Sequence, residues 1–181
     1  STSFAETSWS PGGPQTKGRP MDPDAKPLTH LDSEGRPRMV DVSGKETSDR
    51  RAVARAVVSM KPETLAGIIG GGIRKGGVLD AAKLEGIMAA KKTADLIPLC
   101  HPVPFSQCNL EISWLKDDTL SITSKVSVDA KTGVEMEALT AINVALLTIY
   151  DMCKSHDREM VISEIFLMEK SGGKSGPYKR T

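Results

Sequence analysis

The sequence predicts an α+β fold whose elements follow in the order β-α-β-β-α-β. Apolar and polar residues alternate with the period of a β-strand over residues 51–60 and again over residues 109–128. Apolar residues recur at steps of three and four over residues 131–154, as they do on one face of a helix. These two kinds of period, in this order along the chain, predict a sheet that is covered by helices.

The first half of the chain reads as a strand followed by two helices. Residues 51–60 place Val53 and Val57 on one face of a strand and a row of small apolar residues on the other. Pro62 opens a short helix, because proline is tolerated at the first helical position, and this helix stops at the glycines 70–72. Asp80 is the expected N-cap of a second helix. That second helix is expected over residues 81–97, with Pro98 ending it.

The second half reads as a hairpin, a long helix and a last strand. The hairpin joins residues 109–115 to residues 120–128 through a turn at Asp117 and Asp118. Residues 161–168 supply the last strand after the long helix. This order is that of a ferredoxin-like sandwich, in which an antiparallel sheet carries its helices on one face.

Composition divides the chain into one domain and two tails. Residues 1–27 hold five prolines and four serines without an apolar period, which predicts a disordered tail. Residues 28–176 form a single expected domain, and residues 177–181 a flexible C-terminus.

Charge, aromatic content and cysteine count exclude several function classes. A net charge of +1 and only seven aromatic residues argue against a nucleic-acid binder. Three cysteines without a C-x-x-C pattern indicate a reducing compartment rather than a disulfide framework. No apolar run reaches the roughly 18 residues of a membrane span, so no membrane partner is expected.

The long helix carries different residues on its two faces. One face holds an apolar core stripe, whereas the opposite face has small residues between two acids, Glu137 and Asp151, with Lys154 close to Asp151. Fourteen residues separate these two acids, which at 1.5 Å per residue is roughly 21 Å. One compact site cannot use both acids from one helix. Either the ligand is long, or each end of the helix serves a different site that another subunit completes.

Two further stretches hold candidate functional groups. Cys100 and His101 follow a helix that proline has stopped, where a side chain can point from a rigid end into a cleft; a structural histidine is the alternative reading. The other cysteines are not at zinc-site spacings, so no metal site is expected. Lys75 follows a glycine run that could hold phosphate oxygens, although an ordinary flexible loop explains the same residues.

Several long motifs, in order, closely resemble the MoaC family. The resemblance covers residues 28–176 and rests on the following segments: His30, 39–43, Lys75-Gly76, 86–91, 96–102, 132–140, 147–154 and 170–176. Gly77 stands where the family commonly has Asp, and Glu85 where it has a smaller residue. Neither departure removes a proposed catalytic residue.

The resemblance implies an enzyme of molybdenum-cofactor biosynthesis. The implied activity is a phosphorus-oxygen lyase reaction that converts (8S)-3′,8-cyclo-7,8-dihydroguanosine 5′-triphosphate to cyclic pyranopterin monophosphate and releases pyrophosphate. It also implies a homohexamer built as a trimer of dimers, with active sites at subunit interfaces, and a functional link to a radical SAM GTP cyclase.

The same resemblance assigns residues to roles by motif match. It implies that the catalytic groups are Asp151, Lys154 and Lys75. The residues that would line the substrate are Leu99, Cys100, His101, Met136 and Glu137. The residues that would hold phosphates are Lys91, Lys170 and Arg50.

Some properties stay open at this level. No cofactor is required by the proposed chemistry, while a magnesium ion could accompany the triphosphate. A cytoplasmic location is expected, with the mitochondrial matrix as the alternative for a eukaryotic source.

A ferredoxin-like domain could also sense a nucleotide without altering it, or bind RNA. Pyrophosphate release separates the enzyme from the sensor, and the strands lack the exposed aromatics of an RNA reader.

Overall fold

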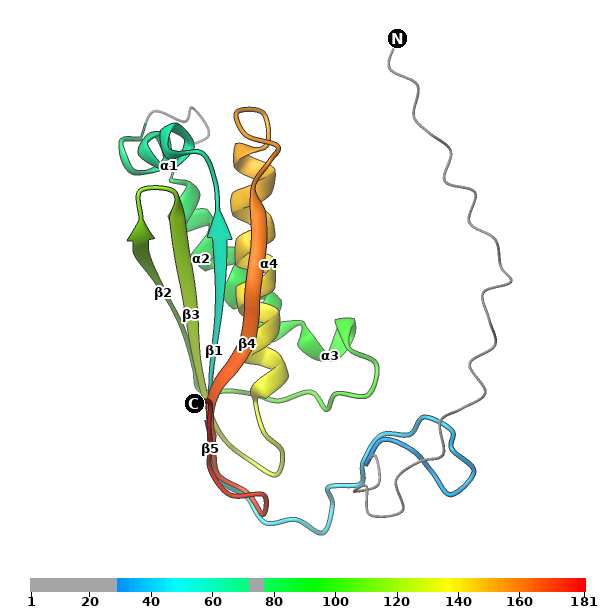
Figure 1. The fold of residues 1–181 in the computed structure, drawn as a ribbon. Coiled ribbons are helices and arrows are strands. Elements are labelled where there is room, and N and C mark those ends of the chain that lie inside the picture. The colour runs from blue at the N-terminus through cyan, green and yellow to red at the C-terminus, as the bar shows by residue number, and fades with distance from the viewer. Residues whose placement is uncertain (1–28, 72–76) are drawn as a thin grey trace, which may run out of the picture.

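The structure of the chain, a computed structural model, describes residues 29–71 and 77–181 (Figure 1). The expected N-terminal tail and the candidate residue Lys75 lie outside the described residues. In chain order, the helices and strands are β1 (Ser48–Ser59), α1 (Pro62–Ile69), α2 (Val78–Lys91), α3 (Thr93–Leu96), β2 (Gln107–Lys116), β3 (Thr119–Ala130), α4 (Glu135–Cys153), β4 (Val161–Ser171) and β5 (Tyr178–Lys179).

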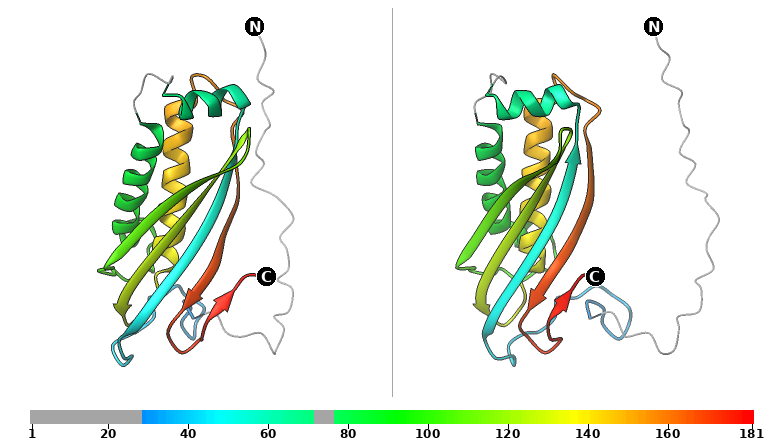
Figure 2. Two further views of the ribbon diagram at one scale, coloured as in Figure 1. Left: turned by 90° about the vertical axis from the view of Figure 1, so that its left-hand side faces the viewer. Right: turned by 60° about the vertical axis from the view of Figure 1, so that its left-hand side comes forward.

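The strands form one antiparallel sheet in the order β2-β3-β1-β4-β5. Without β5, this is the strand order of the ferredoxin-like fold that the sequence predicts. The short β5 pairs with the end of β4 and was not expected from the sequence. Helices α2 and α4 lie on the same face of the sheet, as Figure 2 shows. The α+β prediction with helices on one face is therefore confirmed.

The core lies between this face of the sheet and helix α4. Strand β1 turns Ala52, Ala54 and Ala56 toward the helices, and all three are buried. Small residues at the centre of the sheet let α4 come close and bury Ile142 and Leu146 completely. By length and composition α4 could also cross a membrane. Its buried stripe packs on the sheet, as that of the core helix of a compact domain does.

Helix α2 is held against α4 at a glycine. A Cβ atom added to Gly86 would stand 2.5 Å from Leu110 Cδ2 and 2.8 Å from the carbonyl oxygen of Ala141. No side chain fits there, so Gly86 sets the close approach of α2 to α4 and β2.

The sequence prediction of one helix over residues 81–97 is wrong in two ways. Helix α2 starts three residues earlier, with Gly77 as its N-cap, so Asp80 lies in the first turn rather than at the cap. Val78 is buried, and this contact with the core extends the helix toward its N-terminus. The helix also ends earlier than predicted, at Lys91. A separate helix, α3, begins at Thr93, and the Thr93 hydroxyl donates to the carbonyl of Ala90 at 2.9 Å.

Two further expectations differ in detail. The long helix predicted over 131–154 begins only at Glu135, because Val134 has a non-helical backbone with φ −118° and ψ 25°. On β2, Leu110 is buried but Trp114 on the same face is 51% exposed. Strand β2 is an edge strand, and α2 covers only part of its length.

Candidate active site

A pocket of about 260 Å³ lies at the N-terminal end of helix α4. Three segments that are far apart in the sequence form it: the loop after α3, the turn that leads into α4, and the segment before β1. The lining residues are His30, Leu99, Cys100, His101, Val103, Thr132, Gly133, Glu135, Met136 and Glu137. All five residues that the resemblance assigns to the substrate lie in this one pocket.

The loop that carries His101 is held by local hydrogen bonds. Helix α3 ends at Leu96, and the amide of Cys100 then donates to the carbonyl of Ile97 at 3.0 Å. Prolines at positions 98, 102 and 104 restrict the backbone on both sides of His101. The imidazole of His101 therefore lines the pocket from a stiff loop.

Glu137 is the carboxyl group at the centre of this region. It lies in the first turn of α4, is only 4% exposed, and lines both the pocket and a neighbouring cavity of about 300 Å³ that also contains Lys91. Burial raises the pKa of Glu137, and the charge of Glu135 raises it further. A helix N-terminus favours the carboxylate form, but the desolvation effect is larger here. A carboxyl in this setting takes up a proton more readily than an exposed glutamate does.

Cys100 is not set up as a nucleophile. Burial raises the pKa of its thiol, and the nearby charge of Glu137 raises it further. Reactive cysteines need the opposite shift, because the thiolate is the attacking form. Cys100 therefore lines the pocket as a neutral thiol.

Lys170 reaches the rim of the pocket from strand β4. Its ammonium lies 3.2 Å from Glu135 Oε1 and donates to Ser175 Oγ at 2.8 Å. The resemblance assigns a phosphate to Lys170. A phosphate that binds there would replace or join the carboxylate of Glu135, which lines the same pocket.

Arg50 ties β1 to the segment before α4. Its Nε donates to the carbonyl of Ala130 at 3.2 Å, and its Nη2 donates to the carbonyl of Lys131 at 3.1 Å. Gly173 lies so close to the Arg50 guanidinium that a Cβ atom would overlap Nη1. Arg50 also lines a cavity of about 780 Å³ that includes Lys45 and Lys174. Arg50 therefore lines this cavity together with two further cations and one carboxylate, that of Glu46, and the excess of positive charge suits an anionic group.

The proposed catalytic pair lies at the other end of α4. Lys154 Nζ lies 2.6 Å from Asp151 Oδ1, and the two side chains are 54% and 67% exposed. The ion pair predicted from the three-residue spacing is therefore confirmed. Within this protomer the pair is not brought to the pocket that contains Glu137, because nearly the whole length of α4 separates them.

The sequence pattern did not single out several residues that the fold brings to the pocket. His30 and Glu135 line it. The hydrogen bonds from Ser43 are the main cause that lowers the pKa of the Asp41 carboxyl, and His101 adds a smaller electrostatic effect. His30 and Asp41 are both in segments quoted for the family resemblance, and Glu135 is two residues from Glu137. Their place in the family motifs was the only feature of the sequence that could have pointed to these residues.

In residues 29–71 and 77–181, no three His, Cys, Asp or Glu side chains are grouped so that they could hold a metal ion.

Comparison with known proteins places most of the chain in one family. Residues 39–173 match the profile of the MoaC family. Three curated relatives carry the name cyclic pyranopterin monophosphate synthase. The Brevibacillus brevis protein is 53% identical over 153 residues, which is 84% of this chain and 96% of the relative. The Thermoanaerobacter protein is 54% identical over 84% of this chain and 98% of its own length. The Desulfitobacterium hafniense protein is 56% identical over 84% of this chain and 94% of its own length.

Proposed function

Because the chain belongs to the MoaC family, we propose that it is a cyclic pyranopterin monophosphate synthase acting in molybdenum-cofactor biosynthesis. The observation that carries this proposal is identity above 50% over nearly the whole length of relatives with that name. The pocket supports it, because the five residues that the resemblance assigns to the substrate converge there from two separate segments.

The proposed substrate is the cyclised GTP derivative (8S)-3′,8-cyclo-7,8-dihydroguanosine 5′-triphosphate. Its purine-derived rings are opened and reclosed as a pyranopterin, and a ribose-derived hydroxyl attacks the α-phosphate. This attack forms the cyclic phosphate, breaks the bond to the β-phosphate and releases pyrophosphate. The reaction is a lyase reaction at phosphorus, and none of its steps changes the oxidation state of a resident cofactor.

The pocket groups suit the proton transfers that ring opening requires. Glu137 is buried and has a raised pKa, and the His101 imidazole lies in the same pocket. A carboxyl and an imidazole can each act as a proton donor or acceptor toward the substrate. Lys91 lines the adjoining cavity with Glu137, where a cation can hold a phosphate oxygen. We propose no resident cofactor; any magnesium ion would arrive with the triphosphate.

The proposed active unit is an oligomer in which Asp151 and Lys154 of one chain meet the pocket of another. The exposed pair and the buried Glu137 lie at opposite ends of α4. The outer side of the helical layer carries exposed Leu84, Met88 and Leu147, and such apolar side chains favour contact with another subunit. A hexamer formed as a trimer of dimers would supply these contacts.

The deciding experiment is conversion of the substrate by the purified protein. We expect stoichiometric formation of pyrophosphate and cyclic pyranopterin monophosphate. A protein that binds the cyclised GTP derivative but releases no pyrophosphate would be a nucleotide sensor instead. Coupling the protein to a radical SAM GTP cyclase, the enzyme class that would supply this substrate, should also yield product from GTP.

A further inference from the structure

The segment before β1 forms one wall of the pocket. His30 belongs to this segment and lines two adjoining cavities, the pocket of about 260 Å³ and an apolar cavity of about 510 Å³. Leu99, Cys100 and Met136 line both cavities as well. A residue that precedes β1 therefore faces the same space as substrate residues that follow it by about 70 positions.

A short hairpin holds His30 in place. The amide of Arg38 donates to the carbonyl of His30 at 2.8 Å, and Leu31 forms a bridge with Pro37. Gly35 turns the chain with a φ of +74°, which a residue with a side chain rarely adopts. The two arms of the hairpin are therefore paired at His30 and at its neighbour Leu31.

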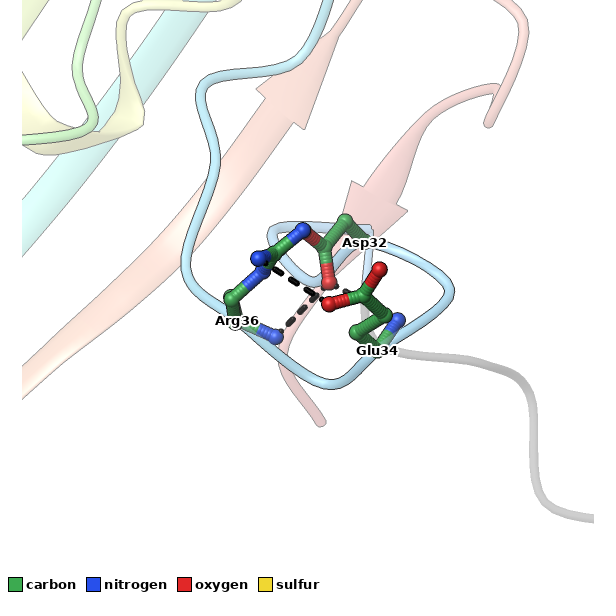
Figure 3. A network of polar contacts seen from close by, with 3 residues as sticks. All are labelled: Asp32, Glu34 and Arg36. Carbon is green, nitrogen blue, oxygen red and sulfur yellow. Dashed lines mark hydrogen bonds and ion pairs between the residues drawn. The ribbon is translucent and has the colours of Figure 1, made fainter.

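A network of polar contacts closes the hairpin (Figure 3). Asp32 Oδ1 accepts hydrogen bonds from the amides of Glu34 at 2.9 Å and Arg36 at 2.8 Å. The Arg36 guanidinium lies 2.9 Å from Asp32 Oδ2 and 3.0 Å from Glu34 Oε2. The hydrogen bonds from Arg36 lower the pKa of Asp32, which keeps this carboxylate ionised. This folded hairpin contributes no residue to the buried core, and its polar network instead fixes the backbone next to His30.

A second set of contacts attaches the segment to the site. Lys131 Nζ donates to the carbonyl of Ser43 at 2.7 Å, and the amide of Ser43 donates to Asp41 Oδ1 at 2.8 Å. Lys131 immediately precedes Thr132 and Gly133, which line the pocket. Asp41, whose pKa is lowered mainly by the hydrogen bonds from Ser43, is also subject to a smaller electrostatic effect of His101. The segment is thus attached on the pocket side of the molecule.

The His30 side chain is exposed, and among the described residues no group makes a hydrogen bond or ion pair with its ring. A neutral imidazole has one donor and one acceptor nitrogen. Purine-derived rings carry both kinds of group along their edge. The pocket presents two imidazoles, His30 and His101, together with the carboxyls of Glu135 and Glu137.

We propose that His30 is a substrate-binding residue, which hydrogen bonds to the purine-derived ring system, and that the Asp32–Arg36 network is the device that positions it. This inference rests on the proposed function for the identity of the ligand. Asp32 and Arg36 do not touch the ligand and act through His30.

The test compares variants of the full chain in steady-state conversion of the cyclised GTP derivative. His30→Ala should raise KM by about tenfold, which is the loss expected for one hydrogen bond to a polar ligand, while kcat changes less. His30→Gln keeps a donor and an acceptor and should recover part of this loss. Ser33→Ala is the matched control in the same hairpin: Ser33 lines neither cavity, so its KM should equal that of the wild type.

A double-variant cycle tests the positioning role. Asp32→Ala should also raise KM, and the double variant His30→Ala/Asp32→Ala should be no worse than His30→Ala alone, because the network acts only through His30. Additive effects would reject the positioning role of the network. A KM for His30→Ala within twofold of the wild-type value, at unchanged melting temperature, would overturn the proposal.

A binding measurement separates this inference from the proposed function. Calorimetric binding of the cyclised GTP derivative is measured in a Lys154→Ala background, with and without His30→Ala. Weaker binding on loss of His30 supports the inference even if the wild-type protein releases no pyrophosphate. Normal turnover by the wild type, combined with identical binding with and without His30→Ala in the Lys154→Ala background, would retain the proposed function and refute the role of His30.

Discussion

Glu137 and Asp151 project from the same helix about 21 Å apart along its axis, by the rise of 1.5 Å per residue. Glu137 is buried in the first turn of α4, and Asp151 is exposed in the last. The distance between them along a straight helix is fixed, because no side-chain movement can shorten it enough. A compact site that used both residues would therefore have to draw them from two chains, as the proposed oligomer does.

Mixed assemblies test this directly. Glu137→Ala and Asp151→Asn are each expected to be inactive alone. Refolded together in equal amounts, they should recover activity at about one quarter of sites, because random pairing places both wild-type groups in that share of interfaces. The measurement is turnover of mixed oligomers verified by mass spectrometry. No recovery in such mixtures would show that each site draws both residues from one chain.

The pair of Asp151 and Lys154 should matter for turnover and not for folding. Both side chains are more than half exposed, and an exposed ion pair contributes about 0–1 kcal/mol to stability. Asp151→Asn and Lys154→Ala should each reduce kcat by at least about a hundredfold, with a melting temperature close to that of the wild type. The matched control is Lys125→Ala, which breaks a similarly exposed pair with Glu111 at 2.8 Å. Equal loss of activity in the control would point to a general surface-charge effect.

Glu137→Gln should stabilise the protein at neutral and higher pH while reducing activity. Burial raises the folded-state pKa of Glu137, so the folded state favours the protonated carboxyl, and wild-type stability falls as the pH rises through that pKa. The amide does not ionise. The variant should therefore melt at a higher temperature than the wild type above this pKa.

The difference in melting temperature between Glu137→Gln and the wild type should disappear in acid. Below about pH 4.3, the ordinary value for a glutamic acid, Glu137 is protonated in both the folded and the unfolded state. Thermal melting of both proteins across pH 4–8 measures this, with Glu85→Gln as the exposed helical control. A gap that is independent of pH would mean that charge burial is not its cause.

Asp157 is expected to stabilise the folded state by joining segments that are far apart in the sequence. It is buried, accepts the amide of Lys61 at 2.7 Å where α1 begins, and accepts the amide of Glu159 at 3.0 Å. Asp157→Ala leaves these donors without their acceptor and should lower the free energy of unfolding by about 2 kcal/mol.

The pH dependence of this effect has the opposite sign to that of Glu137. The hydrogen bond from the Lys61 amide, together with smaller contributions from other groups, lowers the folded-state pKa of Asp157. The stability that the Asp157 carboxylate contributes is therefore present above about pH 3.9, the ordinary aspartate value. It is lost as the pH falls through the lowered pKa. Chemical denaturation at pH 7 and pH 3 measures it. Asp32→Ala is the control, since Asp32 makes similar backbone contacts in a hairpin outside the core. A destabilisation that is equal at both pH values would contradict the role of the charge.

Local patterns were sufficient for most of the elements. The alternation in β1 and the stripe in α4 each follow from the geometry of one element, and so both were predicted. The N-terminus of α2 was misplaced because burial of Val78 outweighs the capping preference of Asp80. Such a contact depends on what lies opposite the helix, and no short window of sequence contains it.

By itself, the sequence determined the order of the elements other than α3 and β5, the family to which the motifs belong, and the separation of Glu137 from Asp151. Each of these depends on residue identity and spacing along the chain. Only the tertiary structure decided that Glu137 is buried with a raised pKa and that Lys170 reaches Glu135. It also decided that His30 shares a pocket with His101. Those properties depend on which surfaces pack together, because desolvation and through-space contact join segments that the chain keeps far apart.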